Sequence, residues 1–298
     1  MGSGVVGAAT GEGFLKAGHD VTFVDINEVR VRELRDRGWD ARTEIDLADE
    51  PESLIFLTLP TPNDGHRYDL SAFTAGTAAV GRALADAQAH HTVVVRSTVP
   101  PGTTEGLVRS VLEEHSGRTA GEGFGLASNP EFLRAASAAE DFAHPWMTVI
   151  ASRDPQTVER LRALLAPFGG ELRTFTNPAE AEFVKAAHNI YNATKISFWN
   201  EMWQVCQSLG IDHDEVATTV ARSAEASFNP MYGIRGGAPY GGVCLPKDTN
   251  GFLGFASDRN IAMPMVEAVV QVNDEMGQLV QRELTDLESK AQVNAKVS

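Results

Sequence analysis

The segment GGVCLPKD, at 241–248, brings together residue types that can do covalent chemistry. Its Cys244 is one of only two cysteines in the chain. The two glycines that open the segment would let a substrate approach the backbone closely, and Lys247 would favour a thiolate on Cys244. Asp248 can orient a water molecule or accept a proton. In a dinucleotide-dependent enzyme, such a thiol would capture an aldehyde as a thiohemiacetal and allow its oxidation to a thioester.

The two cysteines stand in different contexts and lie 38 positions apart. Cys206 falls in a predicted helix beside apolar positions, so we interpret it as a small buried apolar residue. Pro246 is expected to fix a rigid turn between Cys244 and the charged pair that follows. No second cysteine or histidine stands near Cys244 at the spacing of metal ligands, so the sequence predicts no metal site.

A second group of candidate residues lies in AEFVKAAHNIYNATKISFWNE, at 181–201. Lys185 and Asn189 are four residues apart and would share one helical face. An ammonium beside an amide can hold an oxygen from two sides, which suits a developing alkoxide or oxyanion. The same pair is also compatible with a solvated lysine and a helix–helix hydrogen bond. Three further charged residues of this segment are interpreted as structural: Glu182, Lys195 and Glu201.

The first residues of the chain fit a nucleotide-binding pattern, because GSGVVG at 2–7 matches G-x-G-x-x-G. Gly2 would permit the tight turn, Gly4 the approach of a pyrophosphate, and Gly7 close packing of helix and strand. Asp25 follows the next predicted strand and can accept from both ribose hydroxyls while repelling a 2′-phosphate, which favours NAD over NADP. The alternative is a glycine-rich turn with a surface aspartate.

A strand should precede the first glycine of such a motif, and only Met1 does so here. The sequence therefore indicates either a start that is truncated or misassigned, or a sheet without its central strand. In the second case the neighbouring strand edges would be left unpaired and cofactor binding would be weakened.

The first half of the chain alternates between short apolar runs and helical stretches. This alternation predicts a doubly wound parallel sheet covered by helices on both faces, an α/β fold of the Rossmann-like class. The strands are expected at 21–25, 54–60, 92–98, 123–128 and 146–152, and the helices near 8–18, 27–37, 69–89 and 102–115. Asp154 and Pro155 then mark the start of another helix.

The pattern changes after residue 175, where Thr176-Asn177-Pro178 is a helix-start signal followed by no glycine until Gly210. A helix of roughly 30 residues is predicted there, and another helical segment from about 261 to 290. We therefore expect an NAD-binding domain at 1–175 and an all-α domain at 176–298 that carries the Cys244 loop. A long helix with apolar residues on several faces needs a partner, so we expect a homodimer through it.

Three unusual stretches follow predicted strands, at the sheet edge where open parallel sheets bind ligands. They are LPTPND at 59–64, STVPPGTT at 97–104 and SNPEFL at 128–133. Thr98 and Glu131 are polar groups at these strand ends. Each stretch could also be structural, as a rigid turn or a capped helix start.

Composition excludes some classes of protein. The net charge is −15, whereas nucleic-acid binding needs a basic stripe. The sequence contains no apolar run long enough for a membrane span and no signal-peptide pattern, so a cytoplasmic protein is expected.

The motifs in order, GSGVVG, VDIN, LPTP, STVPPGTT, NPEFL, AEFVKAAHN with KISFWNE, and GGVCLPKD, resemble those of the UDP-glucose/GDP-mannose dehydrogenase family. The series spans residues 2–250. The resemblance implies that a nucleotide sugar, with UDP-glucose favoured, is oxidised at its C6 alcohol to a carboxylate by two NAD in succession. It also implies a third, Rossmann-like domain closing over the nucleotide, which this chain would lack.

The resemblance further implies roles for individual residues. Cys244 would be the nucleophile, and Lys185 with Asn189 would stabilise the oxyanion. Proton transfers and the bound water would be served by Asp248, Thr98 and Glu131. The NAD site would be lined by Gly2, Gly4, Val5, Val6, Gly7, Asp25, Arg30, Pro60, Thr61, Ser97, Thr98 and Lys247. The substrate would be held by Glu131, Phe132, Leu133, Lys185, Asn189, Arg235, Tyr240, Gly241 and Gly242.

Two departures from the family pattern bear on function. Ala135 stands where the family usually has a glutamate expected near the cofactor, and APYGG at 238–242 replaces a glycine-rich approach. Two other functions stay open. One is a 3-hydroxy acid dehydrogenase, which would reduce a single NAD and need no cysteine. The other is an inactive NAD-binding or dimer-forming module.

Overall fold

The computed structural model describes residues 1–63, 65, 67–223, 236–242 and 244–297, with side chains described as far as residue 288. The chain divides into two compact units, 1–189 and 190–298, and each is described by itself below. The domain boundary expected near residue 175 stays a prediction.

The first unit contains seven strands among its described residues: β1 (Thr22–Val24), β2 (Asp40–Arg42), β3 (Leu54–Leu57), β4 (Thr92–Val95), β5 (Gly125–Ser128), β6 (Met147–Ala151) and β7 (Glu171–Phe175). Its helices are α1 (Val5–Lys16), α2 (Glu28–Asp36), α3 (Ser71–Asp86), α4 (Arg109–Ser116), α5 (Ala138–Ala143) and α6 (Pro155–Leu165). A π-helical turn, Thr104–Val108, leads into α4, and short 3-10 turns lie at Ala135–Ser137 and Ala166–Phe168. The five predicted strands and the predicted helices are present.

The strands form a parallel pair, β1 and β2, and a five-stranded sheet in the order β3-β4-β5-β6-β7. The predicted doubly wound parallel sheet is confirmed, with one departure: β6 pairs antiparallel with β5 through Ser128 and Ala151. Parallel neighbours usually need a full crossover helix. The link between β5 and β6 holds only the 3-10 turn and the six-residue α5.

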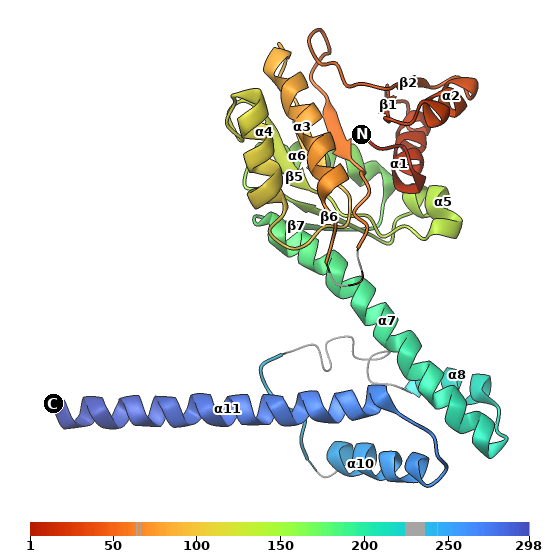
Figure 1. Ribbon diagram of the computed structural model, residues 1–298, viewed down its shortest axis with the longest axis vertical. Coiled ribbons are helices and arrows are strands. Elements are labelled where there is room, and N and C mark those ends of the chain that lie inside the picture. The colour runs from red at the N-terminus through yellow and green to blue at the C-terminus, as the bar shows by residue number, and fades with distance from the viewer. Residues whose placement is uncertain (64, 66, 224–235, 243, 298) are drawn as a thin grey trace. The chain divides into compact units, whose positions relative to one another are not determined.

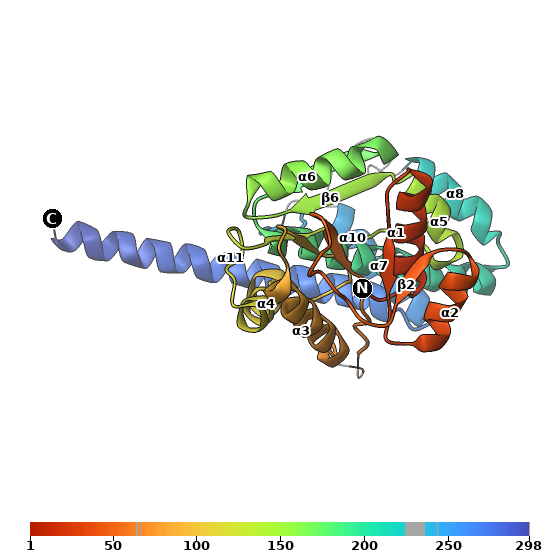
Figure 2. The same cartoon turned by 90° about the horizontal axis from the view of Figure 1, so that it is seen from above.

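Two apolar clusters cover the two faces of the five-stranded sheet, and Figure 1 shows helices on both sides of it. Val93 and Val95 of β4 face a core that α3 and α4 complete with Phe73 and Leu112. Val94, between them, faces the other core, to which α1, α5 and α6 contribute. Figure 2 shows α6 running alongside β6, which it contacts. β4 is therefore buried on both faces, as its continuous apolar sequence predicts.

Met1 and Gly2 make backbone hydrogen bonds to the strands on either side of them. The Met1 nitrogen donates to Phe56 O at 2.9 Å, and Met1 O accepts from Thr58 N at 2.8 Å. Gly2 N donates to Val24 O at 2.8 Å, so these two residues connect β1 with β3. From Gly2 the chain passes through α1 to β1 and β2. It then crosses to β3, which lies on the opposite side of Met1 and Gly2 from β1. The glycine motif therefore begins at the topological switch point, where open α/β sheets bind ligands.

The second unit is helical. It contains the end of α7 (Pro178–Leu209), then α8 (His213–Ser223), α10 (Cys244–Ser257) and α11 (Pro264–Val297). The two long helices predicted from 178 and from about 261 are confirmed as α7 and α11. Val205, Ala256, Met263 and Val266 form its buried core. Cys206 is buried, as predicted.

Two details of this unit bear on the sequence predictions. Glu201 is structural, as interpreted, because its carboxylate accepts from Met265 N at 2.5 Å and Val266 N at 3.2 Å, at the start of α11. The prediction of a rigid turn at Pro246 is wrong. Pro246 lies in the first turn of α10, where its missing N–H interrupts no helical hydrogen bond.

Candidate active site

The glycine motif adopts the geometry of a phosphate-binding turn. Gly2 has a φ of +83°, and a Cβ there would lie 2.6 Å from Thr58 O, so a side chain is excluded. A Cβ on Gly7 would collide with Gly2 O, which fits the close packing predicted at this position. At Gly4, by contrast, a Cβ would meet nothing within 4 Å. The open space lies where a cofactor would approach the backbone.

Helix α1 begins at Val5, directly after Gly4, and no side chain caps its N-terminus. Helices α2 and α6 differ, since Asn27 and Asp154 accept from their first N–H groups. The first turn of α1 also lacks an acidic residue. Its N–H groups and the positive end of its dipole are therefore available to an anion such as a pyrophosphate.

Asp25 is fixed at the end of β1. Its Oδ2 accepts from Ser3 N at 2.6 Å and its Oδ1 from Asn27 N at 2.9 Å. Arg30 Nε donates to Ser3 O at 2.8 Å, so the glycine loop is held from both sides. Each carboxylate oxygen of Asp25 has a further lone pair that can accept from a ribose hydroxyl. Together with the open Gly4 and the uncapped α1, this arrangement fits NAD.

The loops after β3 and β4 meet at the same sheet edge, as the strand-end prediction requires. Thr61 Oγ1 donates to Thr98 O at 2.7 Å, and Ser97 Oγ donates to Leu59 O at 2.7 Å. Pro60, between Leu59 and Thr61 in the chain, is exposed.

A buried ion pair lies beyond the end of β5. Lys185 Nζ is 3.1 Å from Glu131 Oε1, and their side chains are 6% and 12% exposed. Glu131 Oε2 also accepts from Leu133 N at 2.5 Å. The Lys185 ammonium lies 5.4 Å from the ring centroid of Phe132. The structure thus brings together four of the predicted site residues. Asn189, one helical turn further along, is exposed.

Aromatic rings pack around this pair. Phe132 makes edge contacts with Trp146 and His188, at centroid distances of 5.4 and 5.1 Å. The imidazole of His188 stacks on Trp146 at 5.5 Å. Burial, together with the nearby Lys185 charge, lowers the pKa of His188 and so favours its neutral form. The sequence reasoning missed His188, although its spacing of three from Lys185 places both on neighbouring positions of one helical face.

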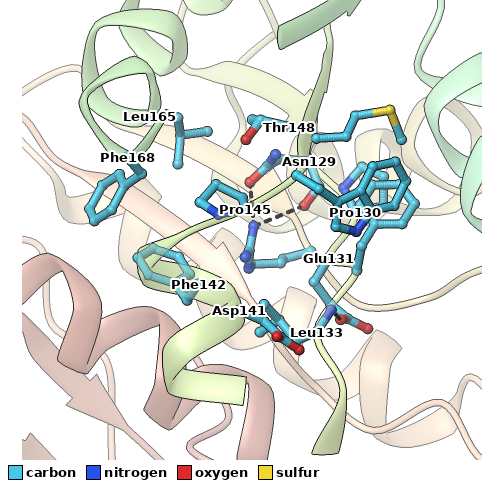
Figure 3. Close-up of a pocket in the computed structure, with 14 residues that line it drawn as sticks. Asn129, Pro130, Glu131, Leu133, Asp141, Phe142, Pro145, Thr148, Leu165 and Phe168 are labelled. Carbon is cyan, nitrogen blue, oxygen red and sulfur yellow. Dashed lines mark hydrogen bonds between the residues drawn. The ribbon is translucent and has the colours of Figure 1, made fainter. Parts of the chain in front are cut away.

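A second buried cation, Arg96, was also missed. Its Nε donates to Thr10 Oγ1 at 2.9 Å and its Nη1 to Asn129 Oδ1 at 2.6 Å. Burial lowers the pKa of Arg96 to about 10. Figure 3 shows Asn129, Glu131 and Phe142 around the adjoining cavity, whose volume of about 30 Å³ suits one water molecule and not a sugar.

Glu182 fastens α7 to the loop after β4, in keeping with its structural interpretation. Its carboxylate accepts from Gly102 N at 2.5 Å, from Thr104 N at 2.7 Å and from Thr104 Oγ1 at 2.6 Å. Burial raises the pKa of Glu182. Because Lys185 lies three residues further along α7, the same contact also fixes the position of Lys185 relative to the loop after β4.

The other predicted residues belong to the second unit. Cys244 is exposed and is the first residue of α10. Lys247 and Asp248 form an exposed ion pair at 3.1 Å. Tyr240 N donates to Asn273 Oδ1 of α11 at 2.7 Å, and the adjoining Gly241 and Gly242 are exposed.

Arg235 lies outside the described residues. Among the residues that the structure does describe, no group of three or more His, Cys, Asp or Glu side chains could hold a metal ion. A search of the same residues finds no helix long and apolar enough to cross a membrane.

Comparison with known proteins identifies relatives along most of the chain. A UDP-glucose 6-dehydrogenase of Haloferax volcanii is 33% identical over 92% of this chain and 68% of the relative. A GDP-mannose 6-dehydrogenase of Azotobacter vinelandii is also 33% identical, over 92% of this chain and 67% of that protein. The crystal structure of a ternary complex of GDP-mannose dehydrogenase from Pseudomonas aeruginosa superposes with a TM-score of 0.88 at 28% identity, covering 96% of this chain and 70% of the other.

Two family models match the chain. Residues 36–169 match the NAD binding domain of the UDP-glucose/GDP-mannose dehydrogenase family, and residues 179–275 match the central domain of the same family. The first unit is accordingly an NAD-binding unit. The predicted family is confirmed: this chain belongs to the UDP-glucose/GDP-mannose dehydrogenase family.

Proposed function

We propose that this chain oxidises the C6 alcohol of a nucleotide sugar to a carboxylate in two NAD-dependent steps, with UDP-glucose as the substrate. The observation that carries the proposal is the buried Lys185–Glu131 pair at the end of β5, in the same unit as a glycine loop that fits NAD. A buried cation at a ligand-binding strand end is suited to an oxygen that becomes negative during reaction. Membership of the family supports the same reaction class.

The residues divide the chemistry among them. NAD, when bound, supplies the hydride acceptor for both oxidations, one molecule for each. Lys185 Nζ stabilises the alkoxide at C6, while Glu131 holds the ammonium in place. In the aldehyde, C6 is electrophilic. The Cys244 sulfur adds to it to form a C–S bond, while the π bond of the carbonyl opens and its electron pair moves to the oxygen, which takes up a proton to give the thiohemiacetal.

Water completes the reaction once the adduct on Cys244 has been oxidised to a thioester. Asp248 orients a water molecule whose oxygen attacks the thioester carbonyl. The C–S bond then breaks, which returns the thiol and releases the carboxylate. Overall, one alcohol, one water and two NAD⁺ are consumed, and one carboxylate, two NADH and three protons are produced.

Counting NADH per substrate tests the reaction class. With limiting UDP-glucose we expect two NADH per sugar, and GDP-mannose should be turned over more slowly. A 3-hydroxy acid dehydrogenase would instead leave UDP-glucose unreacted and form one NADH per 3-hydroxy acid.

Replacement of the nucleophile tests the covalent step. Cys244→Ser should abolish acid formation while NAD affinity by calorimetry stays within about twofold, because the serine hydroxyl is a far weaker nucleophile than a thiolate. Cys206→Ser, a buried position in the second unit, is the matched control and should keep its activity. Uronate formation by Cys244→Ser at the parental rate would contradict the proposed mechanism. A chain that binds neither NAD nor nucleotide sugar would instead be an inactive module.

A further inference from the structure

Arg96 follows directly after β4 and joins three elements of the first unit. It is only 5% exposed. Its Nε donates to Thr10 Oγ1 of α1 at 2.9 Å, and its Nη1 donates to Asn129 Oδ1 after β5 at 2.6 Å. The guanidinium also lies 5.4 Å from the ring centroid of Phe142 in α5. Arg96 therefore connects the helix that follows the glycine motif with the strand end that carries Glu131.

Asn129 lies between this guanidinium and the functional pair along the chain, and it is held firmly. It is buried, and its backbone N–H donates to Val95 O at 2.8 Å. Its Nδ2 donates to Val149 O at 2.7 Å, while its Oδ1 accepts from Arg96. The next residue is a proline, whose ring restricts the backbone before Glu131. A displacement of Asn129 would therefore be passed on to Glu131.

The negative charge of Glu131 reaches Arg96 as well as Lys185. Glu131 Oε1 is 3.1 Å from Lys185 Nζ. Burial lowers the pKa of Arg96 to about 10, and the charge of Glu131 acts in the opposite direction. Asp141 also borders the small cavity beside Arg96 (Figure 3), but its carboxylate pairs with Arg134 at 2.6 Å. The acidic group that acts on Arg96 is thus the one that holds the Lys185 ammonium.

Burying a guanidinium costs free energy, and a well-packed apolar side chain of similar volume would avoid that cost. Such a side chain could not donate to α1 and to Asn129 at the same time, as the fork of an arginine does. We propose that Arg96 is a positioning residue: through Asn129 it fixes the Glu131 carboxylate, and through Glu131 it fixes the ammonium of Lys185. The effect on catalysis rests on the proposed function, whereas the effect on Glu131 does not.

Three variants of the full chain test this role. Arg96→Met removes the guanidinium fork, and Asn129→Ala removes the side chain through which the fork would act. Thr10→Val is the matched control, because it also takes a buried hydrogen bond from Arg96 but leaves the contact with Asn129 in place. If Arg96→Met fails to fold, Asn129→Ala decides the question.

The first measurement, amide hydrogen exchange, does not depend on activity. The Leu133 N–H donates to Glu131 Oε2 at 2.5 Å, so its exchange rate shows whether the carboxylate is in place. The amide of Leu161, which is buried in α6, shows unfolding of the whole unit. The first two variants should each speed exchange at Leu133 by about tenfold or more relative to Leu161, and the control by less than about twofold.

The second measurement is the steady-state rate with UDP-glucose and NAD. The first two variants should lower kcat by about 100-fold and change KM by less than about threefold, because a small displacement of a catalytic group mainly affects the chemical step. The control should keep kcat within about twofold of the parent.

The inference is overturned if Arg96→Met and Asn129→Ala leave exchange at Leu133 unchanged relative to Leu161, or if Thr10→Val speeds it equally. Faster exchange at Leu133 with an unchanged kcat in an active chain would also overturn it. A parent chain that forms no NADH from any nucleotide sugar would contradict the proposed function instead, and the exchange rates would still decide the role of Arg96.

Discussion

Lys185 and Glu131 are side chains whose chemistry depends on each other's presence. Both are almost fully buried, and the carboxylate is the counter-charge within 3.1 Å of the ammonium. Removing one partner leaves the other as an uncompensated buried charge, which costs far more than the pair contributes net. Substitutions at this pair should therefore change the stability of the fold and the catalytic activity to different extents.

Lys185→Met should lower the free energy of unfolding by about 3 kcal/mol, because Glu131 is left buried without its cation. The double variant Lys185→Met/Glu131→Leu should recover most of that loss, and yet remain inactive. Urea denaturation and the NADH assay measure the two effects. Lys195→Met, at an exposed position of α7, is the matched control and should change stability by less than about 1 kcal/mol. If the losses of unfolding free energy from the two single substitutions simply added up in the double variant, the energetic coupling between Lys185 and Glu131 would be contradicted.

At the scale of elements, a single carboxylate holds α7 against the loop after β4. Glu182 accepts three hydrogen bonds from Gly102 and Thr104, and burial raises its pKa. A carboxyl group whose pKa is raised on folding binds its proton more tightly in the folded state. Its contribution to stability is therefore fully present below its unfolded pKa and is lost as pH rises through the folded value.

The unfolding free energy of the parent chain should accordingly rise, relative to Glu182→Gln, as pH falls from neutral toward about 4.5. At pH 7 the variant should be less stable by about 1–2 kcal/mol, because Gly102 N–H then faces an amide in place of a carboxylate. Urea unfolding of both chains between pH 7 and 4.5 measures the difference. Glu180→Gln, exposed in the first turn of α7, is the control and should follow the parent. Parallel curves for Glu182→Gln and its parent would refute the assignment.

Helix α6 offers a test of local capping. Asp154 accepts from Gln156 N at 2.9 Å and Thr157 N at 3.0 Å, as the sequence Asp154-Pro155 predicts. Asp154→Ala should cost about 1 kcal/mol of stability, and Asp154→Asn clearly less. Thermal unfolding of the two variants checks this order, and equal losses would mean that the cap contributes nothing beyond its charge.

The elements also show what the sequence could and could not predict. Long amphipathic helices and continuous apolar strands such as β4 were predictable, because their patterns are local. β2 and β7 were missed, since each is short or largely exposed and has no apolar run. Glu131 and Lys185 were predicted separately as site residues, but their direct pairing joins residues from distant parts of the chain, which no local pattern encodes.

At the scale of the whole molecule, the second unit leaves apolar surface without a covering layer. Val269, Val272, Leu279 and Leu287 of α11 are exposed, at 41%, 63%, 44% and 62%. Their spacing places them along one side of the helix. Exposed apolar stripes of this extent mark interaction surfaces. The sequence predicted a homodimer through α7, and we propose that the α11 stripe also contacts the second copy of the chain.

A homodimer that buries this stripe should be disrupted by charge within it. Val272→Glu/Leu279→Glu should convert the chain from dimer to monomer in light scattering, because each carboxylate would be desolvated at the interface. Gln271→Glu/Gln278→Glu adds the same two charges on the opposite side of α11 and should leave the dimer intact. If both double variants were monomers, net charge and not the apolar stripe would control assembly. If both double variants were dimers, the interface would lie elsewhere. The folded state of each variant is checked by circular dichroism, because α11 contributes Val266 to the unit's core and unfolding of the helix would also disrupt a dimer.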